Sequence, residues 1–104
     1  MEVFVERSND KVFFTIHGEI DTRSGIELSE RFREVVENED IYHVYLDFED
    51  VYNITSAGIG KILKLFKYLN SKGGSITIRG ISPNLRLLFK EIHLDKIIPI
   101  EEKA

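Results

Sequence analysis

Residues 53–63 read NITSAGIGKIL, and the pattern of the chain changes within this stretch. Before it, residues 41–48 (IYHVYLDF) are rich in β-branched and aromatic side chains and predict a central strand. After it, apolar residues recur at the three- and four-residue spacing of a helix, at Ile59, Ile62, Leu63, Phe66 and Leu69. The stretch therefore predicts a sharp turn from a strand into a helix, with two hydroxyls, Thr55 and Ser56, at the turn.

The glycines of this turn, Gly58 and Gly60, allow two interpretations. One is a phosphate-binding loop, but a full loop of that kind continues as Gly-Lys-Ser/Thr, and Lys61 is followed here by Ile62. The dinucleotide fingerprint G-x-G-x-x-G also fails, because residue 63 is leucine. The pattern favours the second interpretation, in which the glycines permit a tight turn and close packing of the helix on the sheet, without a cofactor.

The two hydroxyls also allow two interpretations. A Thr or Ser just before a helix is typical of an N-cap, where its oxygen accepts a hydrogen bond from a free backbone N–H. Alternatively, one hydroxyl is a phosphoacceptor, since the N-terminal end of a helix tolerates the added negative charge. The two interpretations are compatible, and the residues leave both open.

The rest of the chain predicts strands that alternate with helices. Residues 1–6 and 11–17 are expected to form a hairpin around the polar turn 8–10, and residues 18–25 (GEIDTRSG) a second turn. Ser24 or Thr22 is the expected cap of the next helix, whose apolar side carries Leu28, Phe32, Val35 and Val36.

Past the second predicted helix, residues 72–74 end it and residues 75–79 form a strand. Ser82 and Pro83 start a third helix, and Asp95 is the expected cap of a last short turn. The apolar seam of the third helix is Leu85, Leu88, Phe89 and Ile92. The order is β-β-α-β-α-β-α, which predicts one α/β domain over residues 1–104, with a mixed four- to five-stranded sheet and helices mainly on one face.

Composition narrows the possible functions. The chain has 104 residues, a net charge of −4 and no cysteine, so we expect no direct nucleic-acid binding and no thiolate chemistry. No apolar run approaches the roughly 18 residues that span a bilayer, and the N-terminus does not resemble a signal peptide. These features predict a cytoplasmic protein that is not bound to a membrane.

Catalytic and metal-binding patterns are not evident in the sequence. The three histidines, His17, His43 and His93, lie in different predicted elements and share no metal-ligand spacing. No G-x-S-x-G elbow marks a hydrolase. We therefore expect no metal site, no cofactor and no enzymatic activity.

Several motifs in order resemble the STAS domain, the family named for sulfate transporters and anti-sigma factor antagonists. The motifs are GEID at 18–21, LDFEDV at 46–51, TSAGIG at 55–60, PNLRLLF at 83–89 and HLD at 93–95. Each motif is weak alone, but their order and spacing cover almost the whole chain. The resemblance implies a small cytoplasmic antagonist that binds an anti-sigma factor with serine kinase activity, and so releases the sigma factor.

The same resemblance implies roles for individual residues. The kinase would phosphorylate Ser56, which breaks the complex, and a serine phosphatase would restore it. Asp21 would lie close to Ser56 at the same edge of the sheet. The start of the helix from Gly58, together with Lys61 and Leu65, would meet the kinase.

Two positions depart from the family pattern. The residue before the acceptor serine is usually Asp, and here it is Thr55, which adds a second possible acceptor. The position before Leu94 is often Gly, and here it is His93, which carries a local cost if a left-handed backbone is required there.

Three functions follow from the sequence. The first is an anti-sigma factor antagonist switched at Ser56. The second is a constitutive interaction or scaffold module in a stress-signalling assembly, without a phospho-switch. The third, a small nucleotide-binding protein or enzyme built on residues 58–61 (GIGK), ranks last because no base, nucleophile or metal set accompanies the glycines.

Overall fold

Five strands form one mixed sheet in the order β1-β2-β3-β4-β5 in the computed structural model, which describes residues 1–37 and 40–103. The strands are β1 (Glu2–Ser8), β2 (Lys11–Ile20), β3 (His43–Ile54), β4 (Ser75–Arg79) and β5 (Ile100–Glu101). β1 pairs with β2 in antiparallel fashion, as the predicted hairpin requires, and every other neighbouring pair is parallel. The predicted mixed sheet is confirmed, with β3 in the middle.

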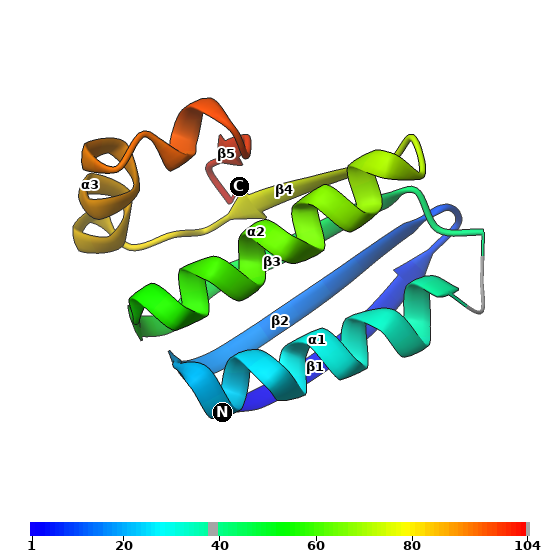
Figure 1. Cartoon of the computed structure of the whole chain (residues 1–104), viewed down its shortest axis with the longest axis horizontal. Coiled ribbons are helices and arrows are strands. Elements are labelled where there is room, and N and C mark those ends of the chain that lie inside the picture. Colours follow the sequence, from blue (N-terminus) through cyan, green and yellow to red (C-terminus); the bar gives the residue numbers. More distant parts are fainter. Residues whose placement is uncertain (38–39, 104) are drawn as a thin grey trace.

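Two long helices cover one face of this sheet. α1 (Thr22–Glu37) and α2 (Ser56–Ser71) lie side by side in front of the strands in Figure 1. α3 (Pro83–Glu91) and the 3₁₀ turn η1 (Leu94–Lys96) lie at one end, where Phe89 packs edge-on against Phe48 of β3. The expectation of helices mainly on one face is confirmed. In the part of the chain that the structure describes, no helix has the length and apolar character needed to cross a bilayer.

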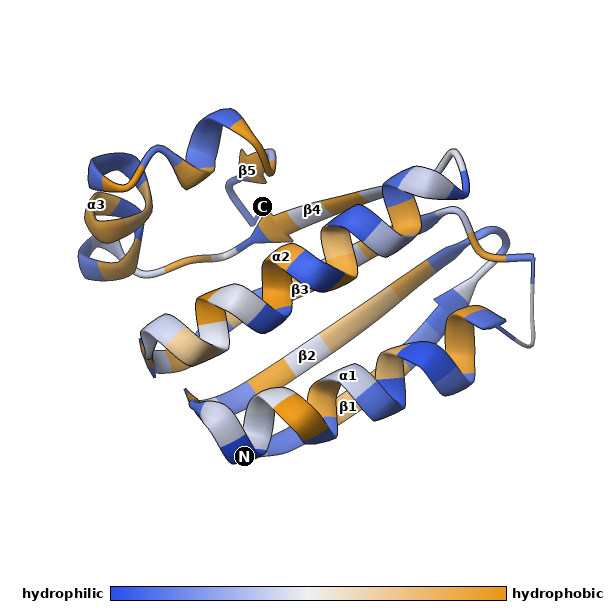
Figure 2. Cartoon of the chain, in the orientation of Figure 1, coloured by the Kyte–Doolittle hydropathy of each residue, from blue (hydrophilic) through white to orange (hydrophobic). Residues whose placement is uncertain are grey.

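The core lies between the sheet and the helices because alternate strand residues point to the same side. Three positions of β2 and three of β3 alternate in this way and are buried: Val12, Phe14, Ile16, Val44, Leu46 and Phe48. From α1, Leu28, Phe32 and Val36 meet them, with the rings of Phe14 and Phe32 stacked at 5.8 Å between centroids. Figure 2 shows apolar and polar residues alternating along α1 and α2, and apolar residues predominating in the middle of β2 and in β4.

The strand β2 is longer than predicted, which corrects the expected turn at residues 18–25. β2 continues to Ile20, paired with Ile54 of β3, and α1 already begins at Thr22. Only Asp21 connects them. Pairing with β3 and burial of Ile20 in the core outweigh the turn preference of the polar and glycine residues around it.

The last part of the chain follows the prediction with three corrections, the first of which is the short strand β5, a strand that the sequence did not predict. Ser82 caps α3 by accepting a hydrogen bond from the Leu85 N–H, and Pro83 starts the helix. The apolar seam ends earlier than predicted, because Ile92 is 44% exposed. Asp95 does not cap η1 but lies inside it; the cap position is His93, in a left-handed conformation with φ 62°. The backbone at His93 is thus the kind that glycine adopts most easily.

Candidate functional site

The start of α2 is joined to the end of β2 through one backbone oxygen. The carbonyl of Ile20 accepts a hydrogen bond from the Thr55 N–H at 2.9 Å, and the Thr55 hydroxyl lies 3.5 Å from the same oxygen. Thr55 Oγ1 in turn accepts a hydrogen bond from the Gly58 N–H at 3.2 Å. Thr55 is therefore the N-cap of α2, as one of the two sequence interpretations predicts.

Gly58 makes this close junction possible. A Cβ at this position would stand 2.3 Å from the carbonyl oxygen of Ile20 and 3.0 Å from its carbonyl carbon. The predicted role of Gly58 in close helix–sheet packing is confirmed. The same role for Gly60 is wrong, because a Cβ there would meet nothing within 4 Å. Gly58 is buried and has no side chain, so its role is to allow the close packing of α2 and not to contact a partner.

Ser56 has a different environment from its neighbour. It is the first residue of α2, it is exposed, and its hydroxyl makes no hydrogen bond within residues 1–37 and 40–103. The first turn of a helix carries backbone N–H groups without intrahelical acceptors, together with the positive end of the helix dipole. The two hydroxyls therefore differ: the Thr55 hydroxyl caps α2, whereas the Ser56 hydroxyl has no hydrogen-bond partner among the described residues.

Asp21 lies beside this junction, since it directly follows Ile20. It caps α1 in a reciprocal arrangement, in which Asp21 Oδ1 accepts from the Ser24 N–H at 2.9 Å and Ser24 Oγ accepts from the Asp21 N–H at 2.8 Å. The expected cap, Ser24 or Thr22, is corrected accordingly: Ser24 takes part, but as the third helical residue. Hydrogen bonds from the backbone and hydroxyl of Ser24 hold the pKa of Asp21 below its ordinary value.

Lys61 and Leu65 differ in what they present to a partner. The Lys61 side chain is half-buried, and its Cγ would lie 2.9 Å from a Cβ at Gly25, so its stem crosses the first turns of α1. Leu65 is 1% exposed and belongs to the core. The expected contact of Leu65 with a partner does not fit this burial, because α2 packs against both α1 and the sheet and Leu65 lies on its buried side. The folded domain offers Lys61 at its surface, but not Leu65.

Removing the Thr55 cap gives a first prediction. Thr55→Ala is expected to lower the free energy of unfolding by roughly 1 kcal/mol, because the Gly58 N–H loses its acceptor. Thr55→Ser and Thr55→Asp keep an accepting oxygen and are expected to stay within about 0.5 kcal/mol of the original chain. Urea unfolding followed by circular dichroism measures these differences. An alanine variant as stable as the aspartate variant would contradict the capping role.

Two features of this end of the sheet were missed from the sequence. Tyr52, near the end of β3, is 74% exposed, and the neighbouring Asn53 donates a hydrogen bond to Glu19 Oε2 at 2.6 Å. Asp47 is buried within β3 and paired with Lys103 at 2.7 Å. A charged residue inside an apolar strand signals that a partner is needed, but not which residue supplies it.

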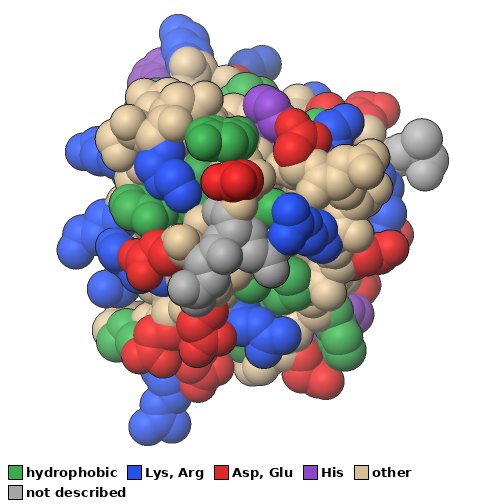
Figure 3. Space-filling model, turned by 90° about the vertical axis from the view of Figure 1, so that its right-hand side faces the viewer, with side chains coloured by type: hydrophobic (Ala, Val, Ile, Leu, Met, Phe, Trp, Pro, Cys, Tyr) green, Lys and Arg blue, Asp and Glu red, His purple; other side chains and the backbone are tan. Residues whose placement is uncertain are grey.

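The histidines lie apart from the start of α2. His17 and His43 are strand residues, as predicted; His17 contacts Asp50 at 3.3 Å, and His43 contacts Asp10 at 3.8 Å. Among residues 1–37 and 40–103, no group of three His, Asp or Glu side chains could hold a metal ion. Figure 3 looks onto the end of the molecule opposite to the start of α2, where basic and acidic side chains are interspersed over the described surface.

One family model and two curated relatives match almost the whole chain. A family model described as "STAS domain" matches residues 3–104. The "Anti-sigma-B factor antagonist" of Bacillus subtilis (strain 168) is 30% identical over 104 residues, covering 100% of this chain and 94% of the relative. The "Anti-sigma F factor antagonist" of Paenibacillus polymyxa is 24% identical over 100 residues, covering 96% and 86% of the two chains.

A solved structure supports the same fold. The phosphorylated form of SpoIIAA, described as a Bacillus cell fate determinant, matches with a TM-score of 0.79 over 99% of this chain and 92% of that chain. The two sequences are 17% identical, so this likeness concerns the fold alone.

Proposed function

The chain belongs to the STAS domain family, and from this premise we propose that it is an anti-sigma factor antagonist whose binding is switched off by phosphorylation of Ser56. Its partner in this proposal is an anti-sigma factor that is also a serine kinase, and a serine phosphatase reverses the modification. The observation that carries the proposal is the division of the hydroxyls at the start of α2: Thr55 is committed to the cap and Ser56 is exposed without a partner.

The start of α2 suits a covalent phosphate on physical grounds. A phosphate adds about −1.5 to −2 charges and three acceptor oxygens, which the N-terminal N–H groups and the dipole of a 16-residue helix favour. The modified chain therefore stays folded. What changes is the surface that a partner meets at the start of α2, where Ser56 is exposed and Thr55 and Lys61 are half-buried.

Thr55 is the weaker candidate for the acceptor. A phosphate on Oγ1 of Thr55 would remove the cap of α2 and crowd the carbonyl of Ile20, 3.5 Å away. The family's usual Asp at this position would accept the same hydrogen bond from the Gly58 N–H, since Asp and Thr are both N-cap residues. Threonine in place of the usual aspartate therefore preserves the cap of α2, and Ser56 remains the preferred phosphoacceptor.

The deciding experiment is a phosphorylation assay. The purified chain is incubated with ATP and each anti-sigma factor kinase of the source organism in turn, and its intact mass is measured. We expect the mass of one phosphate on the original chain and on Thr55→Asp, but none on Ser56→Ala. A phosphate that persists on Ser56→Ala would move the acceptor elsewhere. If a kinase binds the chain without modifying it, the constitutive scaffold function replaces the switch.

A further inference from the structure

Residues 99–103 run along the outer edge of β4, and we call this segment the strap. It contains β5, which pairs only with the last two residues of β4. Two backbone hydrogen bonds hold it there: the Ile78 N–H donates to the Pro99 carbonyl at 2.9 Å, and the Gly80 N–H donates to the Glu101 carbonyl at 3.3 Å. A two-residue strand supplies little backbone pairing, so the attachment of the strap depends on its side chains as well.

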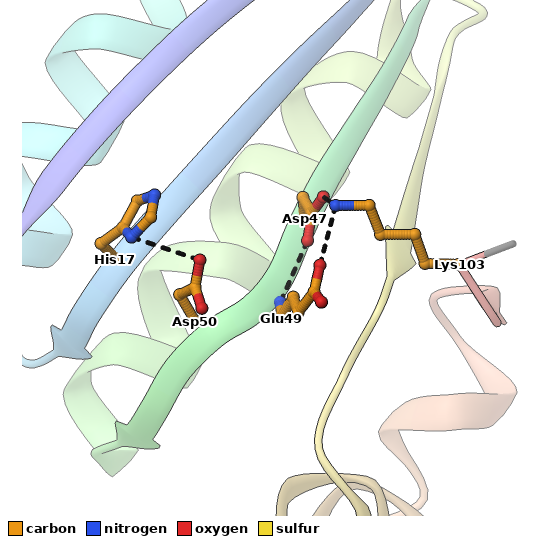
Figure 4. A network of polar contacts seen from close by, with 5 residues as sticks. All are labelled: His17, Asp47, Glu49, Asp50 and Lys103. Atoms are coloured by element: carbon orange, nitrogen blue, oxygen red, sulfur yellow. Dashed lines mark hydrogen bonds and ion pairs between the residues drawn. The ribbon is translucent and has the colours of Figure 1, made fainter.

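Lys103 fixes the far end of the strap on the face of the sheet opposite to α1 and α2, which we call the open face (Figure 4). Its Nζ contacts Asp47 Oδ2 at 2.7 Å and Glu49 Oε2 at 2.8 Å, and hydrogen bonds to these two carboxylates raise the pKa of the Lys103 amine. Asp47 is 5% exposed, and its Oδ1 accepts a hydrogen bond from the Glu49 N–H at 3.0 Å. A buried carboxylate is costly without a counter-charge, so Asp47 needs a base within reach.

Arg79 is a second base within reach of the same carboxylate. Asp47 and Arg79 are partners in the register of β3 and β4, and their side chains line one hollow of the open face together with Lys103. The Arg79 guanidinium nevertheless lies over the ring of Phe13, with Cζ 5.6 Å from the ring centroid. It makes no hydrogen bond or ion pair with the residues that the structure describes, although its Nε is buried. Because buried polar atoms normally have a hydrogen-bond partner, this arrangement indicates a second position of the guanidinium in which it has an acceptor.

We propose that Lys103 and Arg79 compete for Asp47, and that this competition makes the strap a two-state element. In the closed state, which the structure shows, Lys103 contacts Asp47 and the Arg79 guanidinium lies over Phe13. In the open state the strap has left the sheet, and the guanidinium turns from Phe13 to the Asp47 carboxylate. Asp47 is then paired in both states, so opening avoids a buried charge without a partner, which is the main cost of breaking such a contact.

Opening changes two surfaces of the domain. The N–H groups of Ile78 and Gly80 lose their acceptors in the strap, so the outer edge of β4 gains free hydrogen-bond donors. The ring of Phe13, which is stacked on Tyr45 at 4.9 Å between centroids, loses the guanidinium that covers it. Free donors along a strand are the groups to which another extended segment adds. The strap therefore regulates access to this edge of the sheet.

A double-mutant cycle tests the competition. While Lys103 is present, Arg79→Met is expected to change the equilibrium constant for unfolding by less than about threefold, because Asp47 keeps its partner. In the Lys103→Met chain, the same substitution is expected to raise that constant by at least about tenfold, because the buried carboxylate then lacks both bases. Urea unfolding of the four chains measures the constants. Equal effects of Arg79→Met in the two backgrounds would overturn the proposal.

Arg86→Met is the matched control for this cycle. Arg86 also contacts the strap, but its carboxylate partner is Glu102, at 3.4 Å, and not Asp47. Its removal is therefore expected to add to the effect of Lys103→Met without coupling. If Arg86→Met showed the same dependence on Lys103 as Arg79→Met, the coupling would reflect general loosening of the strap, and the competition for Asp47 would be refuted.

Nuclear magnetic resonance of the folded chain follows both halves of the switch. In Lys103→Met, the amide protons of Ile78 and Gly80 are expected to exchange with solvent at least about tenfold faster, relative to amides in the middle of β3, because the strap opens more often. The Nε–H signal of Arg79 is expected to shift, because the guanidinium gains a carboxylate acceptor. Unchanged relative exchange would show that Lys103 does not hold the strap, and an unmoved Arg79 signal would show that Arg79 does not replace it; either result overturns the proposal.

Discussion

Gly58→Ala is expected to lower the free energy of unfolding by roughly 2 to 4 kcal/mol. The added methyl group would stand 2.3 Å from the carbonyl oxygen of Ile20 and 3.0 Å from the Ile20 Cγ2. This oxygen also accepts the Thr55 N–H and lies where β2 pairs with β3, so it cannot move aside as the end of a flexible side chain could. The start of α2 must shift away from the sheet instead.

Gly60→Ala is the matched control two residues further along the same helix. No atom lies within 4 Å of its Cβ position, and alanine is the better helix former. We expect this variant to gain about 0.5 to 1 kcal/mol. Urea unfolding of both variants compares them directly. If the two substitutions changed stability in the same direction, the close approach of α2 to Ile20 would not be the reason for Gly58.

Phosphorylation of Ser56 is expected to weaken binding to the anti-sigma factor by about a hundredfold, which corresponds to roughly 3 kcal/mol. A dianion in the middle of a contact surface must lose its water or displace the partner. Among the residues that the structure describes, no basic side chain is paired with Ser56 to offset that cost. Calorimetric titration of the partner with the original chain, before and after phosphorylation, measures the change.

Two substitutions refine this measurement. Ser56→Glu adds one negative charge at the site, and Ser71→Glu adds the same charge at the exposed far end of α2, about 22 Å away. We expect the first to weaken binding and the second to leave it unchanged. Equal affinities for the phosphorylated and unmodified chains would exclude Ser56 from the contact surface, even if the kinase modifies it.

The fold was predictable because local patterns and tertiary packing agree over most of the chain. The strand β4 and the cap of α3 coincide with their sequence signals. In α2 the fully buried apolar side chains are Ile62, Leu65 and Leu69, whereas Ile59, Leu63 and Phe66 of the predicted seam are only partly buried. β2 and β3 are the exceptions, because both run longer than predicted: residues 18–20 read as a turn, and β3 continues past residue 48 to Ile54. These additional strand residues pair with each other, although more than thirty residues separate them in the sequence.

The sequence predicted which residues form the candidate site, but not which of the two hydroxyls caps α2. The stretch TSAGIG places two hydroxyls at a helix start, and only the structure assigns the cap to Thr55. Leu65 was misjudged because α2 packs on both the sheet and α1, so its buried side is wider than a single seam. The contact between Asp47 and Lys103 joins residues far apart in the sequence, and no local pattern encodes it.

The cap of α2 has a consequence for how much information the chain can carry. Two adjacent hydroxyls of equal standing would give a kinase four products: unmodified, two singly modified isomers and a doubly modified chain. Because Oγ1 of Thr55 accepts a hydrogen bond from the Gly58 N–H and Ser56 is exposed, we expect an enzyme to modify Ser56 alone. Under the proposed function, each molecule then reports a single yes-or-no state, and a phosphatase needs to recognise only one product to reset it.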